Sequence, residues 1–222
     1  QESGKEYAIT GFGYFSNPPN AGAMIFDVTD PTNPVKMSDI SEMPGFDVKT
    51  WKNFAYGVDG TSSSLSGRVA DISDVSNPQI VGSFPTAHNL FISEDGYMIL
   101  AVPGIRIFDL NPNPASPTLI WQDNQNSGHD AAVIGNRLYD FHGSTGTFIY
   151  DFSNPAAPQL LGAITDPAIR YHHSGWVTED EKYLYLCDEL ARHLTPDITI
   201  WDISDVGNPR KVGAYADPDA TI

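Results

Sequence analysis

The chain has 222 residues, of which 41% are hydrophobic and 11% aromatic, which suits an ordered core and argues against a disordered polypeptide. Acidic residues outnumber basic ones by 28 to 12, so the formal net charge is −16. Such a surface repels phosphate backbones and anionic lipids, so we expect no nucleic-acid partner. Cys187 is the single cysteine, which excludes an intrachain disulfide, and no apolar run approaches the ~20 residues of a membrane span.

An aspartate that ends a short apolar run recurs five times along the chain. The first copy is Asp27, after the run 23–26, and Pro34 follows it within the same turn. The later copies are Asp71, Asp109, Asp151 and Asp202, at successive spacings of 44, 38, 42 and 51 residues. A period near forty predicts a repeat architecture. Because each aspartate enters a similar turn rich in Asp, Ser, Asn and Pro, we interpret all five as structural.

Strand-like runs fill each repeat in the same order. In the first unit the run 6–10 already corresponds to a second strand, so an opening strand is missing. In later units, paired runs such as 88–92 with 97–101, joined by a turn that contains glycine, predict antiparallel hairpins. Four short strands per unit predict an all-β fold, a β-propeller of four-stranded antiparallel blades. We expect one domain over 1–222, with five blades near residues 5–40, 45–84, 86–122, 127–164 and 171–216.

The two ends of the sequence bear on how such a ring closes. Neither end supplies the opening strand that the first unit lacks, and residues 217–222 follow the last unit. The chain is therefore either an unusual five-blade ring or part of a larger one. We favour the larger ring, because an unpaired blade edge is costly.

One position of the repeat carries side chains of the kind that bind metals. The opening strand of a propeller blade is innermost, so its first residues line a mouth of the central channel. Alignment of the units places Asp47, His88, His129 and His173 there, at separations of 41, 41 and 44 residues. Imidazole and carboxylate donors predict a site for a divalent transition metal such as Zn, Fe, Mn, Cu or Ni. The alternative interpretation is a polar channel lining that bonds water.

Further polar residues are secondary candidates for this site. They are Asn89, Asp130 and Ser174, each one residue after a primary candidate, His172 beside His173, and Glu189 after the strand-like run 183–187. Asp188 and Glu189 could also simply cap a turn. Acidic loops are a separate candidate location for Ca²⁺.

Two other histidines carry no prediction of ligand binding. We interpret His142 as hydrogen-bonded packing near the end of a second strand. His193 lies in an insertion, residues 189–196, that lengthens the fifth unit, and we expect a solvated loop there. The sequence contains no GxSxG elbow, no Gly-rich phosphate loop and no CxxC pair.

Several of these motifs together resemble a known family. They are EYAITG at 6–11, FDVTDPTNP at 26–34, DVK at 47–49, AHN at 87–89, GHDA at 128–131, HSGWVTED at 173–180 and CDEL at 187–190. In this order they resemble LVIVD-repeat proteins, and more closely the secreted "choice-of-anchor B" family. The resemblance implies an exported or surface β-propeller with a C-terminal anchor, and further blades after Ile222. It implies no particular reaction.

These observations favour an exported or cell-surface binding module over an enzyme. Its partner would be a protein or a surface polymer that the sequence does not identify. One alternative is a metal-dependent enzyme, an oxidase or hydrolase, that uses the same histidines. A second alternative is a structural component of a surface layer or filament.

Overall fold

The structure is a computed structural model that describes residues 4–13, 21–60, 66–123, 127–191 and 196–216. Within these ranges every regular element is a β-strand. Among the described residues, no helix has the length and apolar character needed to cross a membrane. His193 lies outside them. The chain divides into two compact units, residues 1–102 with 106–120, and residues 103–105 with 121–222.

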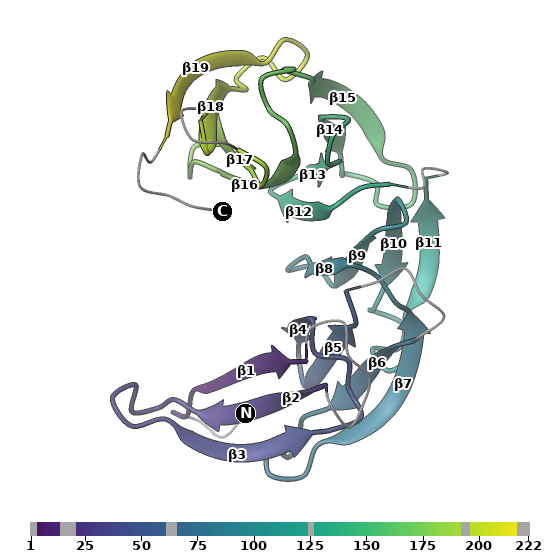
Figure 1. Cartoon of the computed structure of the whole chain (residues 1–222). Helices are drawn as coiled ribbons and strands as arrows, with labels where there is room; N and C mark the ends of the chain where they lie inside the picture. The colour runs from purple at the N-terminus through teal and green to yellow at the C-terminus, as the bar shows by residue number, and fades with distance from the viewer. Residues whose placement is uncertain (1–3, 14–20, 61–65, 124–126, 192–195, 217–222) are drawn as a thin grey trace. The chain divides into compact units, whose positions relative to one another are not determined.

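The strands form five antiparallel sheets that follow the chain in order (Figure 1). The first has three strands, β1 (Tyr7–Phe12), β2 (Gly22–Asp27) and β3 (Val35–Ile40). The second has β4 (Asp47–Trp51), β5 (Phe54–Val58), β6 (Ser66–Asp71) and β7 (Gln79–Pro85). The third has β8 (Asn89–Ile92), β9 (Tyr97–Ala101), β10 (Ile105–Asp109) and β11 (Thr118–Gln122).

Two further sheets lie in the second unit. One has β12 (Asp130–Ile134), β13 (Arg137–Phe141), β14 (Thr147–Asp151) and β15 (Gln159–Ile164). The other has β16 (His172–Val177), β17 (Tyr183–Asp188), β18 (Ile198–Asp202) and β19 (Arg210–Tyr215). The five sheets confirm the predicted number of blades, and within the described residues the first sheet has three strands, without the opening strand that the sequence also lacks.

The five repeat aspartates have the structural role that the sequence predicts. Each carboxylate accepts the backbone N–H of the residue two positions later, at 2.8–3.0 Å. A backbone hydrogen bond also closes each turn. The residue just before the repeat proline donates its N–H to the carbonyl of the residue three positions earlier. The proline that follows has no N–H to place, so it ends the turn without losing a hydrogen bond.

The hydrogen bonds to these turn carboxylates lead us to expect a loss of stability in acid. Hydrogen bonds from Thr29, Ser73, Ser153 and Ser204 lower the pKa values of Asp27, Asp71, Asp151 and Asp202 below 3.8. A lowered pKa in the folded state contributes stability that is present above the unfolded pKa and is lost as the pH falls through the folded one.

We therefore expect the urea concentration at the unfolding midpoint to decrease when the pH is lowered below about 4. The decrease should be less steep in an Asp71→Asn variant, whose amide still accepts the Ser73 N–H but does not titrate. Asp95→Asn, at an exposed position in another turn, serves as the control. Parallel curves for wild type and Asp71→Asn between pH 5 and 3 would contradict this.

A β-bulge recurs where the last two strands of a sheet pair. The register shifts at Ile25/Phe26, Val69/Ala70, Ile149/Tyr150 and Ile200/Trp201. The extra residue increases the local twist of the outermost strand. Four sheets with the same irregularity at the same place are copies of one structural unit.

A small residue faces each of these bulged pairs from the outermost strand. In the first sheet, Ser38 donates its hydroxyl hydrogen to the carbonyl of Val75 in the turn of the second sheet, at 2.6 Å. At the same register in β15, a Cβ on Gly162 would overlap the carbonyl oxygen of Val206 in the next sheet. Successive sheets therefore dock through the backbone of the repeat turn, which leaves space for only a small side chain.

Apolar cores fill the space between successive sheets of the first unit. One cluster joins the first two sheets; its buried members are Ala23, Ile25, Ile40, Met43, Ala55 and Ala70. Another cluster joins the second and third sheets; its buried members are Tyr56, Val58, Val69, Phe84, Ala87, Leu90, Met98, Leu100, Phe108 and Leu110. The opening strands of neighbouring sheets also meet, β4 with β8 in the first unit and β12 with β16 in the second. Within each unit, such a contact brings together two of the positions at which the sequence places its candidate ligands: Asp47 and His88 in the first, His129 and His173 in the second.

Candidate functional site

Three side chains that could bind a metal gather in the second unit. His129 directly precedes β12, His173 lies near the start of β16, and Glu189 directly follows β17. Strand β16 pairs antiparallel with β17, with His172 opposite Asp188, so its start lies beside the end of β17. Because β12 contacts β16, His129 joins the same place.

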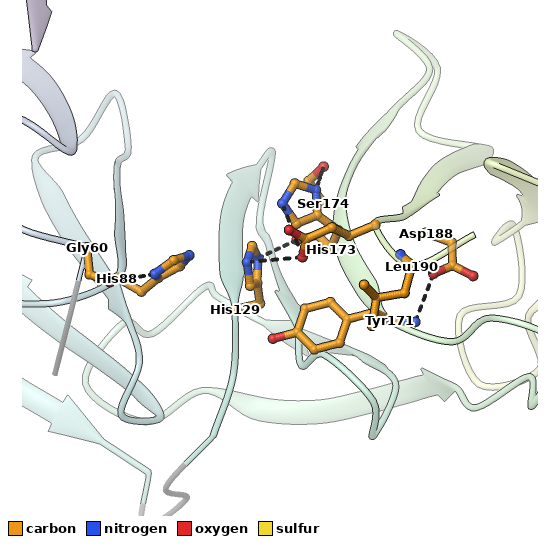
Figure 2. A network of polar contacts seen from close by, with 9 residues as sticks. Gly60, His88, His129, Tyr171, His173, Ser174, Asp188 and Leu190 are labelled. Atoms are coloured by element: carbon orange, nitrogen blue, oxygen red, sulfur yellow. Dashed lines mark hydrogen bonds and ion pairs between the residues drawn. The ribbon is translucent and has the colours of Figure 1, made fainter. Parts of the chain in front are cut away.

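The donor atoms of these three residues are close enough to share one ion. One ligand atom from each lies within 4.8 Å of the others, and within the described residues this is the one group of metal-type side chains that gathers so closely. Glu189 Oε2 lies 3.7 Å from His129 Nε2 and 3.9 Å from His173 Nε2. The imidazole centroids are 4.3 Å apart, and Figure 2 shows the two rings side by side.

The other ring nitrogen of each histidine already has a polar neighbour. His129 Nδ1 lies 3.2 Å from the carbonyl oxygen of His173, and His173 Nδ1 lies 3.4 Å from Ser174 Oγ. A carbonyl accepts only from an N–H, so His129 donates its Nδ1–H to His173, which makes Nε2, on the side of Glu189, its ligand atom. Metal-binding histidines commonly have this arrangement, because the second hydrogen bond fixes the ring and its tautomer.

A β-bulge explains why His173 reaches this cluster. The register of β16 against β17 shifts between His172 and Ser174, so His173 is the extra residue. His172 is 2% exposed and its Nδ1 lies 2.8 Å from Thr147 Oγ1. Burial lowers the pKa of His172 to about 4, so it is neutral at pH 7. Adjacent histidines therefore have separate environments, and His172 is not in the cluster.

Asp188 holds together the backbone around Glu189. Its carboxylate is 4% exposed and accepts three backbone N–H groups, from Arg170 at 2.8 Å, Tyr171 at 2.9 Å and Leu190 at 3.1 Å. Figure 2 shows Asp188 beside Leu190 and the Tyr171 segment. Asp188 thus caps a turn, as the sequence indicated, while its neighbour Glu189 turns toward the histidines.

Tyr171 borders the cluster and was not predicted from the sequence. Its ring meets that of His129 edge to face, with centroids 5.2 Å apart at 84° (Figure 2). Burial, and then the charge of Glu189, raise the pKa of its phenol, so the hydroxyl is protonated at neutral pH. Tyr171 does not follow the repeat spacing that identified the histidines, so no pattern in the sequence distinguished it.

Two of the predicted ligands, His88 and Asp47, lie in the first unit. His88 Nδ1 is 2.7 Å from the carbonyl oxygen of Gly60, which leaves Nε2 as the ligand atom, as in His129. Asp47 accepts the N–H of Leu90 at 3.0 Å and forms an ion pair with Lys49. A metal site that combines these residues with His129 and His173 stays a prediction.

The remaining secondary candidates have local hydrogen bonds. Asn89 Oδ1 accepts the N–H of Leu90 at 3.1 Å, and Asp130 Oδ1 accepts the N–H of Ala131 at 2.7 Å. Ser174 contacts His173, so it is placed to orient a ligand. The structure thus brings together His129, His173 and Glu189. Glu189 is a secondary candidate in the sequence, and in the structure it supplies the third ligand atom. Calcium binding by acidic loops stays a prediction.

One part of the chain matches a family model. The model described as the LVIVD repeat matches residues 47–86, which contain the second sheet. No curated protein matches the chain.

Solved structures with similar folds cover nearly the whole chain. A periplasmic gluconolactonase from Pseudomonas aeruginosa is 12% identical with a TM-score of 0.70, over 98% of this chain and 70% of that one. A protein from Lactobacillus plantarum is 15% identical with a TM-score of 0.69, over 98% and 69%. A hypothetical selenium-binding protein from Sulfolobus tokodaii is 12% identical with a TM-score of 0.65, over 97% and 63%. At such identities the likeness concerns the fold alone: this chain has a β-propeller fold, and one of its five sheets matches the LVIVD repeat.

Proposed function

We propose that this protein is an exported or cell-surface β-propeller that acts as a binding module and holds a divalent transition metal through His129, His173 and Glu189. The observation that carries the metal site is the convergence of three donor atoms, from three separate elements, within 4.8 Å. The acidic composition and the resemblance to choice-of-anchor B proteins support the location.

The donor set suits a transition metal better than calcium. Two imidazole nitrogens and one carboxylate oxygen are typical ligands of Zn²⁺, whereas Ca²⁺ takes six to eight oxygens. Around a tetrahedral ion with bonds of about 2.0–2.1 Å, neighbouring donors lie about 3.4 Å apart. The distances of 3.7 and 3.9 Å from Glu189 to the two histidines are therefore close to those of a loaded site.

Zinc binding by the purified chain tests this proposal. We expect one high-affinity Zn²⁺ per chain by isothermal titration calorimetry, and at least about a 100-fold weaker affinity for His129→Ala, His173→Ala and Glu189→Gln, since each removes a ligand. Glu179→Gln, which changes an exposed glutamate near the same strand pair, is the matched control and should bind as wild type does. Equal affinity in all these proteins would refute the site.

His88→Ala tests the sequence prediction that His88 shares the same ion. If it does, as its spacing of 41 residues from His129 in the repeat predicts, the substitution weakens zinc binding as well. A fourth protein ligand would make the site a closed one of the structural kind.

A second candidate function is a metal-dependent enzyme, and one observation favours it. The cluster itself has three protein donors, and catalytic zinc sites have three such ligands and keep a position open for water or substrate. Unchanged zinc affinity in His88→Ala would favour this function over a closed binding site.

A further inference from the structure

A second group of reactive side chains lies in the same unit, apart from the His129–His173–Glu189 cluster. Ser127 Oγ is 2.8 Å from His142 Nε2. On the other side of the ring, His142 Nδ1 is 3.0 Å from Asp140 Oδ2 and 3.3 Å from Asp140 Oδ1. A hydroxyl, an imidazole and a carboxylate are thus joined in line.

The burial of the three residues is graded from the carboxylate to the hydroxyl. Asp140 is 1% exposed and His142 is 3% exposed, whereas Ser127 is exposed. A buried charged group needs a partner, and His142 supplies one to Asp140. The hydroxyl at the accessible end is where a molecule from solvent can meet the group.

The imidazole of His142 is held firmly in place. Its backbone N–H donates to Gly146 at 2.8 Å and its carbonyl accepts from Thr145 at 3.2 Å, which closes a tight turn after β13. The ring packs edge to face against Phe148, with centroids 5.8 Å apart at 81°. These contacts fix the ring between its two polar neighbours.

The backbone of Ser127 is also held in place. Its carbonyl accepts the N–H of Gly104 at 2.8 Å, and nearby Asp123 donates its N–H to Ile105 at 3.0 Å. Ser127 therefore meets His142 from a fixed backbone position.

The chemistry of the groups determines the direction of the two hydrogen bonds. An ionised Asp140 can only accept, so His142 carries a proton on Nδ1 and has a lone pair on Nε2. The bond between Ser127 and His142 is then donated by the serine hydroxyl. A serine that donates to a histidine oriented by a buried aspartate has the arrangement of an activated nucleophile.

We propose that Ser127, His142 and Asp140 form a nucleophilic triad that hydrolyses carboxylic esters. Ser127 Oγ attacks the ester carbonyl carbon while its proton passes to His142 Nε2. The bond to the alcohol breaks, and the alcohol leaves with that proton. Water then attacks the acyl group, gives its proton to Nε2, and the bond to Ser127 Oγ breaks to release the acid. The proton on Nε2 returns to Ser127. With a net charge of −16, the protein favours neutral or cationic esters over anionic ones.

The pH dependence of this reaction follows from the groups that face His142. The hydrogen bond to Asp140 raises the pKa of His142 above 6.5, with a further contribution from the charge of Asp123 and against the effect of burial. The base acts only when it is neutral. The rate should therefore rise with pH through a midpoint above 6.5.

A fluorophosphonate probe tests the triad on the full chain, in EDTA so that no metal takes part. At pH 8 we expect one covalent adduct, mapped by peptide mass spectrometry to Ser127, and a burst of nitrophenol with p-nitrophenyl acetate. Ser127→Ala and His142→Gln should remove the adduct, and Asp140→Asn should slow labelling at least about 100-fold. Ser144→Ala changes an exposed serine two residues from His142 and should label as wild type does.

The possible results separate this proposal from the metal site. An adduct at Ser127 in EDTA supports the triad whether or not zinc binds to the chain. The proposal is overturned by the absence of an adduct at Ser127, by labelling that persists in His142→Gln, or by ester hydrolysis that EDTA abolishes and Ser127→Ala leaves intact. Because Ser127 is exposed, Ser127→Ala should fold normally, and circular dichroism of each variant checks this.

Discussion

Replacing Gly162 with alanine is expected to lower the free energy of unfolding by about 3 kcal/mol or more, beyond the usual cost of a single added methyl group. A Cβ at this position would overlap the carbonyl oxygen of Val206, which belongs to the backbone of the next sheet's turn. A backbone carbonyl cannot rotate away as a side chain can. The two sheets would therefore have to separate, and β15 would lose its docking to the repeat turn.

Gly213 provides the matched control for this substitution. It lies at the same register in β19 as Gly162 does in β15, opposite Ile200 rather than Ile149. A Cβ on Gly213 would meet Ile200 Cδ1 at 3.4 Å, an ordinary contact with a side chain. Gly213→Ala should change the stability by less than about 0.5 kcal/mol. Urea denaturation of both variants measures the difference, and equal effects would show that sheet docking does not depend on this glycine.

Replacing Asp188 with alanine is expected to have the second largest effect, a loss of about 3 kcal/mol in stability together with weaker zinc binding. The substitution removes the acceptor of three backbone N–H groups, those of Arg170, Tyr171 and Leu190. Charge-assisted hydrogen bonds of this kind contribute more than neutral ones, and their donors are partly shielded from water. Glu189 lies in the backbone segment that these bonds hold, so its carboxylate would lose its fixed position.

Asp188→Asn separates the role of charge from that of shape. The amide oxygen can still accept from Tyr171 and Leu190, but the amide nitrogen would face the N–H of Arg170. We expect an intermediate loss of stability in denaturant titrations, with zinc affinity measured on the same samples. Asp151→Asn, in an exposed turn where one N–H is accepted, is the control and should remain near wild type. Wild-type stability in Asp188→Ala would mean that water replaces the carboxylate.

The candidate metal site was only partly visible in the sequence. His129 and His173 could be found because they keep the phase of the repeat, 44 residues apart, and identical positions in neighbouring sheets must meet. Glu189 does not follow the repeat spacing. It reaches the site because the antiparallel pairing of β16 and β17 places the end of one strand beside the start of the other, and because a bulge turns His173 toward it.

The Ser127–His142–Asp140 group left no motif in the sequence at all. The sequence alone predicts hydrogen-bonded packing for His142, because it lies near the end of a second strand. Its partner Ser127 is 15 residues away and meets it only across the hairpin of β12 and β13. Such a group depends on side-chain direction and burial, which spacing alone does not specify.

The sequence by itself determined the repeat: its strands, its turns with aspartate and proline, the number of sheets and the short first sheet. These features depend on local interactions, such as an aspartate accepting an N–H two residues later, so a stretch of ten residues is enough to encode each of them. Only the tertiary structure decided which side chains meet. Contacts between sheets join residues far apart in the chain, such as His129 and His173, and a single bulge changes which of two adjacent histidines, His172 or His173, faces the cluster.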